Sequence, residues 1–213
     1  LTARQLALQL KKHLGVPLTL INQGGASGSI GTRSALTAPA DGYTLLVSAD
    51  SLGTQRVMGI SDMSYGDFQV IAPLTNDPKV IVVAGDSPYE TIHQLLEDIN
   101  SRPRQVKMSY TGPGGSGHVQ SLIYNRFGLE MALTAYPGGA DCILAVLGHQ
   151  VDFTNANYST IVSYLASGDL RLLAVSATKR LPAHPEVPAL AEVIPGSEAL
   201  MAIPYTPLSL LVH

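Results

Sequence analysis

The stretch VKMSYTGPGGSGHVQSLIY, residues 106–124, predicts a strand, a glycine-rich turn and a helix. Apolar Val106, Met108 and Tyr110 alternate with polar residues, which is the pattern of a half-buried strand. The glycines that follow permit backbone angles that other residues resist, and Ser116 is predicted to be the N-cap of the helix. Such a turn brings free N–H groups to the positive end of a helix dipole, an arrangement that binds anions.

The same device occurs twice more. Residues 18–36, LTLINQGGASGSIGTRSAL, and residues 132–147, ALTAYPGGADCILAVL, each predict an apolar strand, glycines and a helix opened by Ser or Asp. A single turn of this kind can be an ordinary strand-to-helix connection that binds nothing. Three of them in a chain of 213 residues indicate convergence on a ligand.

Strands and helices alternate along the whole chain, which predicts an α/β fold with mainly parallel sheets and right-handed crossovers. The glycine turns would then share the carboxyl edge of each sheet. Residues 53–67 lack periodicity, and the sequence TNDP at 75–78 is expected to interrupt one strand before another begins at Lys79. A hinge is therefore predicted at 75–79. The other predicted strands are 18–21, 43–48, 68–74, 151–154, 170–175 and 208–212, and the other predicted helices are 1–14, 91–99, 161–166 and 189–193.

Composition excludes several classes of protein. The net charge is −3 and no basic run occurs, so a nucleic-acid-binding surface is not expected. The single cysteine, Cys142, rules out an internal disulfide and a cysteine zinc cluster, and the six histidines are not paired, so we expect no metal. No stretch approaches the roughly 20 apolar residues of a membrane span, and the start lacks the features of a signal peptide. The chain is thus expected to be cytosolic, or exported with a leader outside these residues.

An enzyme is the alternative from a different class. Gly112-x-Gly114-x-x-Gly117 fits the dinucleotide-binding fingerprint and lies between a strand and a helix, as that motif requires. The fingerprint needs an acidic residue at the end of the next strand, but Glu130 stands at its beginning. Neither Ser27 nor Ser116 lies in the G-x-S-x-G turn of a hydrolase. No cofactor is expected.

Three polar residues, His118, Asp50 and Asp141, have both an ordinary and a functional interpretation, whereas Arg33 has only an ordinary one. His118 lies in the first turn of its helix, where it could make a local hydrogen bond or contact a ligand. Asp50 and Asp141 could be a loop acid and an N-cap, or could meet an amine or a bridging water in a pocket. Arg33 is expected to be a solvated side chain.

The chain resembles the solute-binding proteins of tripartite tricarboxylate transporters, the Bug or TctC-like family. The resemblance covers nearly the whole chain in order: NQGGASGSIG at 22–31, DGYTLL at 41–46, SYTGPGGSGH at 109–118, YPGG at 136–139 and RLPAHPEVPALAE at 180–192. The family implies a monomeric, periplasmic, two-lobed Venus flytrap of type II that does no chemistry. It would capture a small carboxylate (a di- or tricarboxylate, an acidic amino acid or an aromatic acid) between its lobes and deliver it to membrane subunits. A carboxylate sensor for a signalling partner is a nearby alternative.

The resemblance also implies a division into lobes and a set of ligand contacts. Residues 1–77 with 179–213 would form the first lobe and 78–178 the second, with a second connection between about 176 and 206. The family's opening strand, its proline–glycine–glycine loop and its closing helices would lie outside these residues. The implied contacts are Ser27, Gly28, Ser29, Ser48 and Asp50 in the first lobe, and Thr111, Ser116, Gly117, His118, Gly139, Ala140 and Asn155 in the second.

The candidate loops contain no Lys or Arg. These loops are residues 22–31, 48–51, 109–118, 136–141 and 154–157. Backbone N–H groups, hydroxyls and helix N-termini are therefore expected to neutralise the bound carboxylate.

Overall fold

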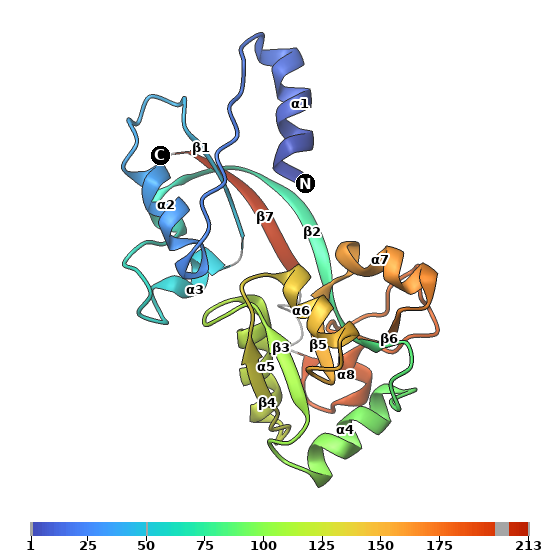
Figure 1. The fold of residues 1–213 in the computed structure, drawn as a ribbon. Helices are drawn as coiled ribbons and strands as arrows, with labels where there is room; N and C mark the ends of the chain where they lie inside the picture. Colours follow the sequence, from blue (N-terminus) through green and yellow to red (C-terminus); the bar gives the residue numbers. More distant parts are fainter. Residues whose placement is uncertain (1, 50, 199–204, 213) are drawn as a thin grey trace. The chain divides into compact units, whose positions relative to one another are not determined.

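The computed structural model describes residues 2–49, 51–198 and 205–212. The chain divides into two compact units, Leu1–Asn76 with Pro207–His213, and Asp77–Thr206. Each unit contains strands and helices, so the predicted α/β fold class is confirmed. Figure 1 shows the elements along the chain.

The second unit is built on a mixed sheet. Its strands are the second half of β2 (Gln69–Ala84), β3 (Lys107–Tyr110), β4 (Ala132–Ala135), β5 (Phe153–Asn157) and β6 (Leu170–Val175). The order is β2-β5-β3-β4, with β6 on the other side of β2 (Figure 1). Strand β3 is parallel to β4 and β5, whereas β2 is antiparallel to β5 and β6. The parallel part of the sheet is therefore β5-β3-β4, which includes the two strands that the glycine turns follow.

Helices cover both faces of this sheet. On one face α4 (Ile92–Ser101), α5 (Ser116–Arg126) and α8 (Leu190–Val193) enclose a core that includes Leu95, Met108 and Phe153. On the other face α6 (Gly139–Leu147) and α7 (Tyr158–Ser167) enclose a core that includes Val82, Val146 and Ile161. This doubly covered sheet explains why β2 is an almost unbroken apolar run from Val80.

The first unit has a smaller core. It contains α1 (Thr2–Leu14), η1 (Ala26–Gly28), α2 (Ser29–Leu36), β1 (Leu45–Ser48), α3 (Ser51–Gln55), η2 (Tyr65–Asp67), the first half of β2 and, from Pro207 onward, β7 (Tyr205–Val212). Strand β1 pairs antiparallel with β7. Ala35, Leu52, Met63, Phe68 and Leu211 form the core. Helix α1 has the predicted extent, but none of its residues is buried.

Three predictions about local structure are wrong. Residues 18–21 belong to no strand, and their apolar Leu20 and Ile21 are exposed. The predicted break at 75–78 is absent, because β2 runs continuously through it. The register with β5 begins at Lys79 and that with β6 at Val80, so neither recorded ladder requires an N–H group from Pro78. Residues 53–67, expected to be irregular, include the end of α3 and the turn η2.

The structure also divides the chain later than the sequence-based scheme. The second unit extends to Thr206, whereas the second lobe was expected to end at 178. The physical reason is packing: Ala189 bridges to Val175 of β6, and Leu190 is fully buried in the core beneath α4 and α5. The first boundary, between Asn76 and Asp77, falls inside the segment predicted to be a hinge.

Two features are absent from the part of the chain that the structure describes. Across 2–49, 51–198 and 205–212, no helix is long and apolar enough to cross a membrane. The same residues contain no group of three or more His, Cys, Asp or Glu side chains placed to hold a metal ion.

Candidate ligand-binding site

Two glycine turns lie side by side in the second unit. Strands β3 and β4 are parallel, with Tyr110 opposite Ala135, and the Tyr136 N–H donates to the Tyr110 carbonyl at 2.9 Å. The turns that follow these strands lead into α5 and α6, so both helices begin at the carboxyl edge of the sheet, where β3, β4 and β5 end. The predicted residues Thr111, Ser116, Gly117, Gly139 and Ala140 all belong to these turns and to the first helical residues.

Glycines are the N-caps of both helices. Gly115 caps α5 and Gly138 caps α6, and neither helix start has a side-chain cap hydrogen bond. The predictions that Ser116 and Asp141 would be N-caps are therefore wrong: Ser116 is the first residue of α5, and Asp141 is the third of α6. A Cβ at Gly115 would lie 2.9 Å from the Thr111 hydroxyl oxygen, so the turn is closed too tightly for a larger residue. The first amides of α5 can thus face a ligand without a competing side-chain cap.

His118 is fixed from two sides. The Gly114 N–H donates to its Nδ1 at 3.2 Å, and the imidazole stacks on the Tyr110 ring with centroids 5.6 Å apart. Since Nδ1 accepts, the neutral ring has its proton on Nε2. The local hydrogen bond that was one interpretation of His118 is therefore present, and Nε2–H remains a possible donor to a ligand.

Asn155 is tied into a buried polar cluster at the same edge. Asn155 is only 6% exposed. It follows Thr154, which lies opposite Ser109 of β3. The Asn155 Nδ2 donates to the Tyr124 hydroxyl at 3.3 Å, and its Oδ1 accepts from the Ser176 hydroxyl at 3.1 Å. Tyr124 and Ser176 are themselves 3.2 Å apart. Burial raises the pKa of Tyr124, so its hydroxyl stays protonated and can donate.

A third helix also starts at this edge, but its N-terminus is occupied. Helix α7 begins at Tyr158, directly after β5. The Asp77 carboxylate of β2 accepts a hydrogen bond from the Ser159 N–H in its first turn at 3.1 Å, and another from the Ser159 hydroxyl. The Asp77 carboxylate thus offsets the positive end of the α7 helix dipole, whereas no side chain caps the N-terminus of α5 or α6.

The first unit holds its own predicted residues in a strained turn. Ser27 has φ +52° and Gly28 has φ +86°, and the latter is the N-cap of α2, whose first residue is Ser29. The Gln55 side chain, 1% exposed, donates from Nε2 to the Ser27 carbonyl at 3.2 Å. Its Oε1 accepts from the Ser61 hydroxyl at 2.8 Å. Gln55 was not predicted, because the stretch around it has no periodicity.

The end of β1 lies in the same unit. Ser48 is its last residue, is 8% exposed and donates to the Ala49 carbonyl at 3.4 Å. The Tyr65 hydroxyl donates to the same carbonyl at 2.9 Å. Asp50 lies outside the described residues. The structure therefore places seven predicted residues at one edge of the second unit, and four around β1 and the start of α2 in the first.

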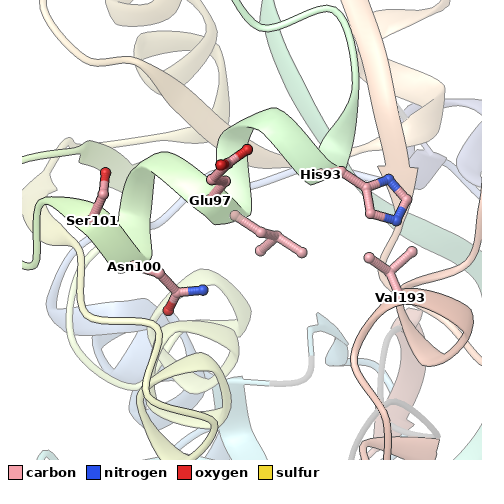
Figure 2. Close-up of a pocket in the computed structure, with 6 residues that line it drawn as sticks. His93, Glu97, Asn100, Ser101 and Val193 are labelled. Atoms are coloured by element: carbon pink, nitrogen blue, oxygen red, sulfur yellow. The ribbon is translucent and has the colours of Figure 1, made fainter.

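A pocket of about 670 Å³ lies elsewhere in the second unit. Figure 2 shows that α4 supplies His93, Glu97, Asn100 and Ser101, with Val193 across from them. None of the predicted ligand contacts lines it.

Comparison with known proteins identifies the family. The model of the tripartite tricarboxylate transporter family receptor, TctC, matches residues 2–208. The chain belongs to this family. The resemblance stated from the sequence is therefore confirmed.

Several known proteins are similar to this chain in sequence and in fold. BugT of Bordetella pertussis is 29% identical over 210 residues, covering 95% of this chain and 63% of BugT. A ligand-free TctC solute-binding protein from Polaromonas is 28% identical, covers 98% of this chain and 70% of that chain, and superposes with a TM-score of 0.72. An R. palustris protein with adipate is 24% identical, covers 99% and 71%, and has a TM-score of 0.88. The chain thus spans less than two thirds of BugT.

Proposed function

We propose that this chain is the ligand-capturing part of an extracytoplasmic solute-binding protein, located in the periplasm. It captures a small carboxylate between two lobes and delivers it to the membrane subunits of a tripartite tricarboxylate-type transporter. The observation that carries the proposal is the pair of glycine-capped helix starts, α5 and α6, on adjacent parallel strands. The TctC family membership and the adipate in the R. palustris relative support it.

The arrangement has enough binding energy for a carboxylate. One helix N-terminus contributes about 0.3–1 kcal/mol when exposed and up to about 2 kcal/mol when partly buried. Hydrogen bonds to a charged acceptor contribute about 1.5–3 kcal/mol each. Two helix ends with hydroxyl donors such as Ser116 and Thr111 can therefore sustain micromolar binding, about −8 kcal/mol, after the cost of ordering.

The enzyme alternative has less support. The turn Gly112–Gly117 has the glycines of a dinucleotide site, but no acid ends β4, whose last residue is Ala135. The family consists of solute-binding proteins, and the proposal is that this chain likewise does no chemistry.

A thermal-shift panel tests the proposal. The probes are adipate, succinate, citrate, glutamate and benzoate, with NADH for the enzyme alternative and adipamide as the uncharged control. We expect at least one carboxylate to raise the unfolding temperature in a saturable way, while NADH and adipamide do not. The proposal would be contradicted if only NADH raised the unfolding temperature. It would also be contradicted if none of the carboxylates did.

A further inference from the structure

Gln120 has a buried side-chain carbonyl without a hydrogen-bond partner. The residue belongs to α5 and is only 2% exposed. Its Oε1 is buried, and no hydrogen bond reaches it from the residues that the structure describes. A buried acceptor that has lost water without gaining a donor destabilises the fold, so such groups are rare in native proteins and each requires an explanation.

Helix geometry places Gln120 between the start of α5 and the buried polar cluster of Asn155. Gln120 follows Ser116 by four residues and precedes Tyr124 by four, so the three lie on one face of α5. On that face the Tyr124 hydroxyl lies 3.3 Å from Asn155 Nδ2 and 3.2 Å from the Ser176 hydroxyl. Gln120 therefore lies one helical turn closer than Tyr124 to the carboxyl edge of the sheet, where α5 begins.

The Gln120 side chain leans towards the first turn of α5. Side chains on a helix slope towards its N-terminus and cover the turn that precedes their own Cα, which for Gln120 is the turn of Ser116 and Gly117. A Cβ on Gly117 would lie 3.2 Å from the Tyr110 Cβ, so this turn lies close against β3. Ser116 and His118 are half-buried, so the turn is accessible to a ligand.

The unpartnered atom is an acceptor, whereas a carboxylate needs donors. The carboxylate of a ligand would bind the first N–H groups of α5 and hydroxyls such as that of Ser116. An ionised carboxylate oxygen cannot pair with Gln120 Oε1, because both groups only accept. A hydroxyl group elsewhere on the ligand can pair with it. An ammonium group fits less well, because it would bring three N–H donors to this one carbonyl.

We propose that Gln120 Oε1 accepts a hydrogen bond from a hydroxyl group of the bound ligand, which makes the site selective for hydroxycarboxylates. The inference rests on the proposed carboxylate-binding function and adds to it a substrate class and the residue that selects this class. A ligand hydroxyl supplies the donor that Gln120 lacks. A carboxylate without the hydroxyl leaves the carbonyl buried and unpaired, and polar sites discriminate strongly against such analogues.

Calorimetric titration with matched acids tests this selectivity. Three pairs differ by one hydroxyl: malate and succinate, citrate and tricarballylate, and mandelate and phenylacetate. We expect the parent to bind the hydroxy acid of at least one pair about 10-fold or more tightly than its partner. Aspartate, compared with succinate, tests an ammonium donor in the same way. The inference is wrong if no pair shows the preference, or if aspartate is preferred and no hydroxy acid is.

Gln120→Met tests whether Gln120 causes the preference. This substitution keeps the length of the side chain and removes both polar groups. We expect it to weaken the hydroxy acid selectively and to reduce the preference to about 2-fold or less. Gln105→Met is the matched control, because Gln105 is exposed and precedes β3 at the opposite end of that strand; it should keep the preference of the parent. If Gln120→Met weakens both acids of a pair equally, the inference is wrong.

Thermal unfolding without ligand gives an independent readout. An apolar group of similar shape removes the cost of an unpartnered buried carbonyl, so the unfolding temperature of Gln120→Met should equal or exceed that of the parent. Gln120→Leu is the second variant and should behave in the same way. A clear decrease in both variants would show that a bound water or a protein group already satisfies Oε1, and the inference would be wrong.

Failure of the inference differs from failure of the proposed function. If the parent binds carboxylates but does not prefer the hydroxy acids, only the selectivity assigned to Gln120 is contradicted. If the parent binds none of the acids, the proposed function is contradicted as well.

Discussion

The side-chain amide of Asn155 donates to the hydroxyl of Tyr124 at 3.3 Å and closes a three-residue ring. The Ser176 hydroxyl donates to Asn155 Oδ1, so its own oxygen is left to accept from Tyr124. Each of the three groups donates once and accepts once. The ring joins β5, the residue after β6 and the last turn of α5 inside the second unit, and so fixes the helix whose first turn belongs to the candidate site.

Breaking this ring should loosen α5. Tyr124→Phe removes one donor and one acceptor from a buried cluster, and we expect it to lower the free energy of unfolding by about 1–3 kcal/mol. Urea denaturation measures the change. Tyr43→Phe is the matched control, because Tyr43 is 89% exposed and should have no effect. Equal stability of Tyr124→Phe and the parent would show that the ring is not maintained in solution.

Charge at the start of α5 should control binding. Ser116→Asp puts a carboxylate on the first residue of the helix, where it would occupy the anion site and repel the ligand. We expect it to abolish carboxylate binding in a calorimetric titration. Ser116→Ala removes only one hydroxyl and should weaken binding a few-fold. If Ser116→Asp bound a carboxylate as well as the parent does, the helix start would not be the site.

Acid should remove one stabilising interaction in α4. Hydrogen bonds from Arg102 and then from the Tyr89 hydroxyl lower the pKa of Asp98 from 3.8 to about 2. Because the folded-state pKa is the lower one, the ionised carboxylate stabilises the fold above pH 3.8, and this contribution disappears as the pH falls towards 2. Asp98→Asn should lower the unfolding temperature by about 2–4 °C at pH 7 and show less change between pH 4 and pH 2. Identical pH profiles for the variant and the parent would count against this ion pair.

Ligand binding should make the molecule more compact. If 75–79 and a second connection between about 176 and 206 join two lobes, a bound carboxylate should close them as rigid bodies. Small-angle X-ray scattering should then report a smaller radius of gyration at saturating ligand. An unchanged radius would mean that capture involves no closure.

Local patterns predicted the fold class and the positions of the glycine turns, and the resemblance supplied the implied ligand contacts. Strand β3, helix α5 and its neighbours follow from alternating and helical periodicity, which depend on nearby residues. Sequence patterns gave the wrong secondary structure or helix cap where strand pairing with a distant segment or tight backbone packing determines the local structure. Residues 18–21 have a strand-like pattern but belong to no strand. Gly115, and not Ser116, is the N-cap of α5, because the helix begins at Ser116, one residue earlier than predicted.

The sequence predicted the loops of the candidate site but not the residues that hold those loops in place. Gln55, which holds the Ser27 carbonyl, belongs to a stretch without periodicity, and its contact spans 28 residues of sequence.

The most direct test of carboxylate capture is to identify the molecule that co-purifies with the protein. The protein is purified without added ligand and denatured, and the released small molecules are analysed by mass spectrometry, with Ser116→Asp treated in parallel. We predict a small carboxylate in the parent sample and its absence from the Ser116→Asp sample. A nucleotide, a cation or a neutral sugar released from the parent would contradict carboxylate capture at the starts of α5 and α6.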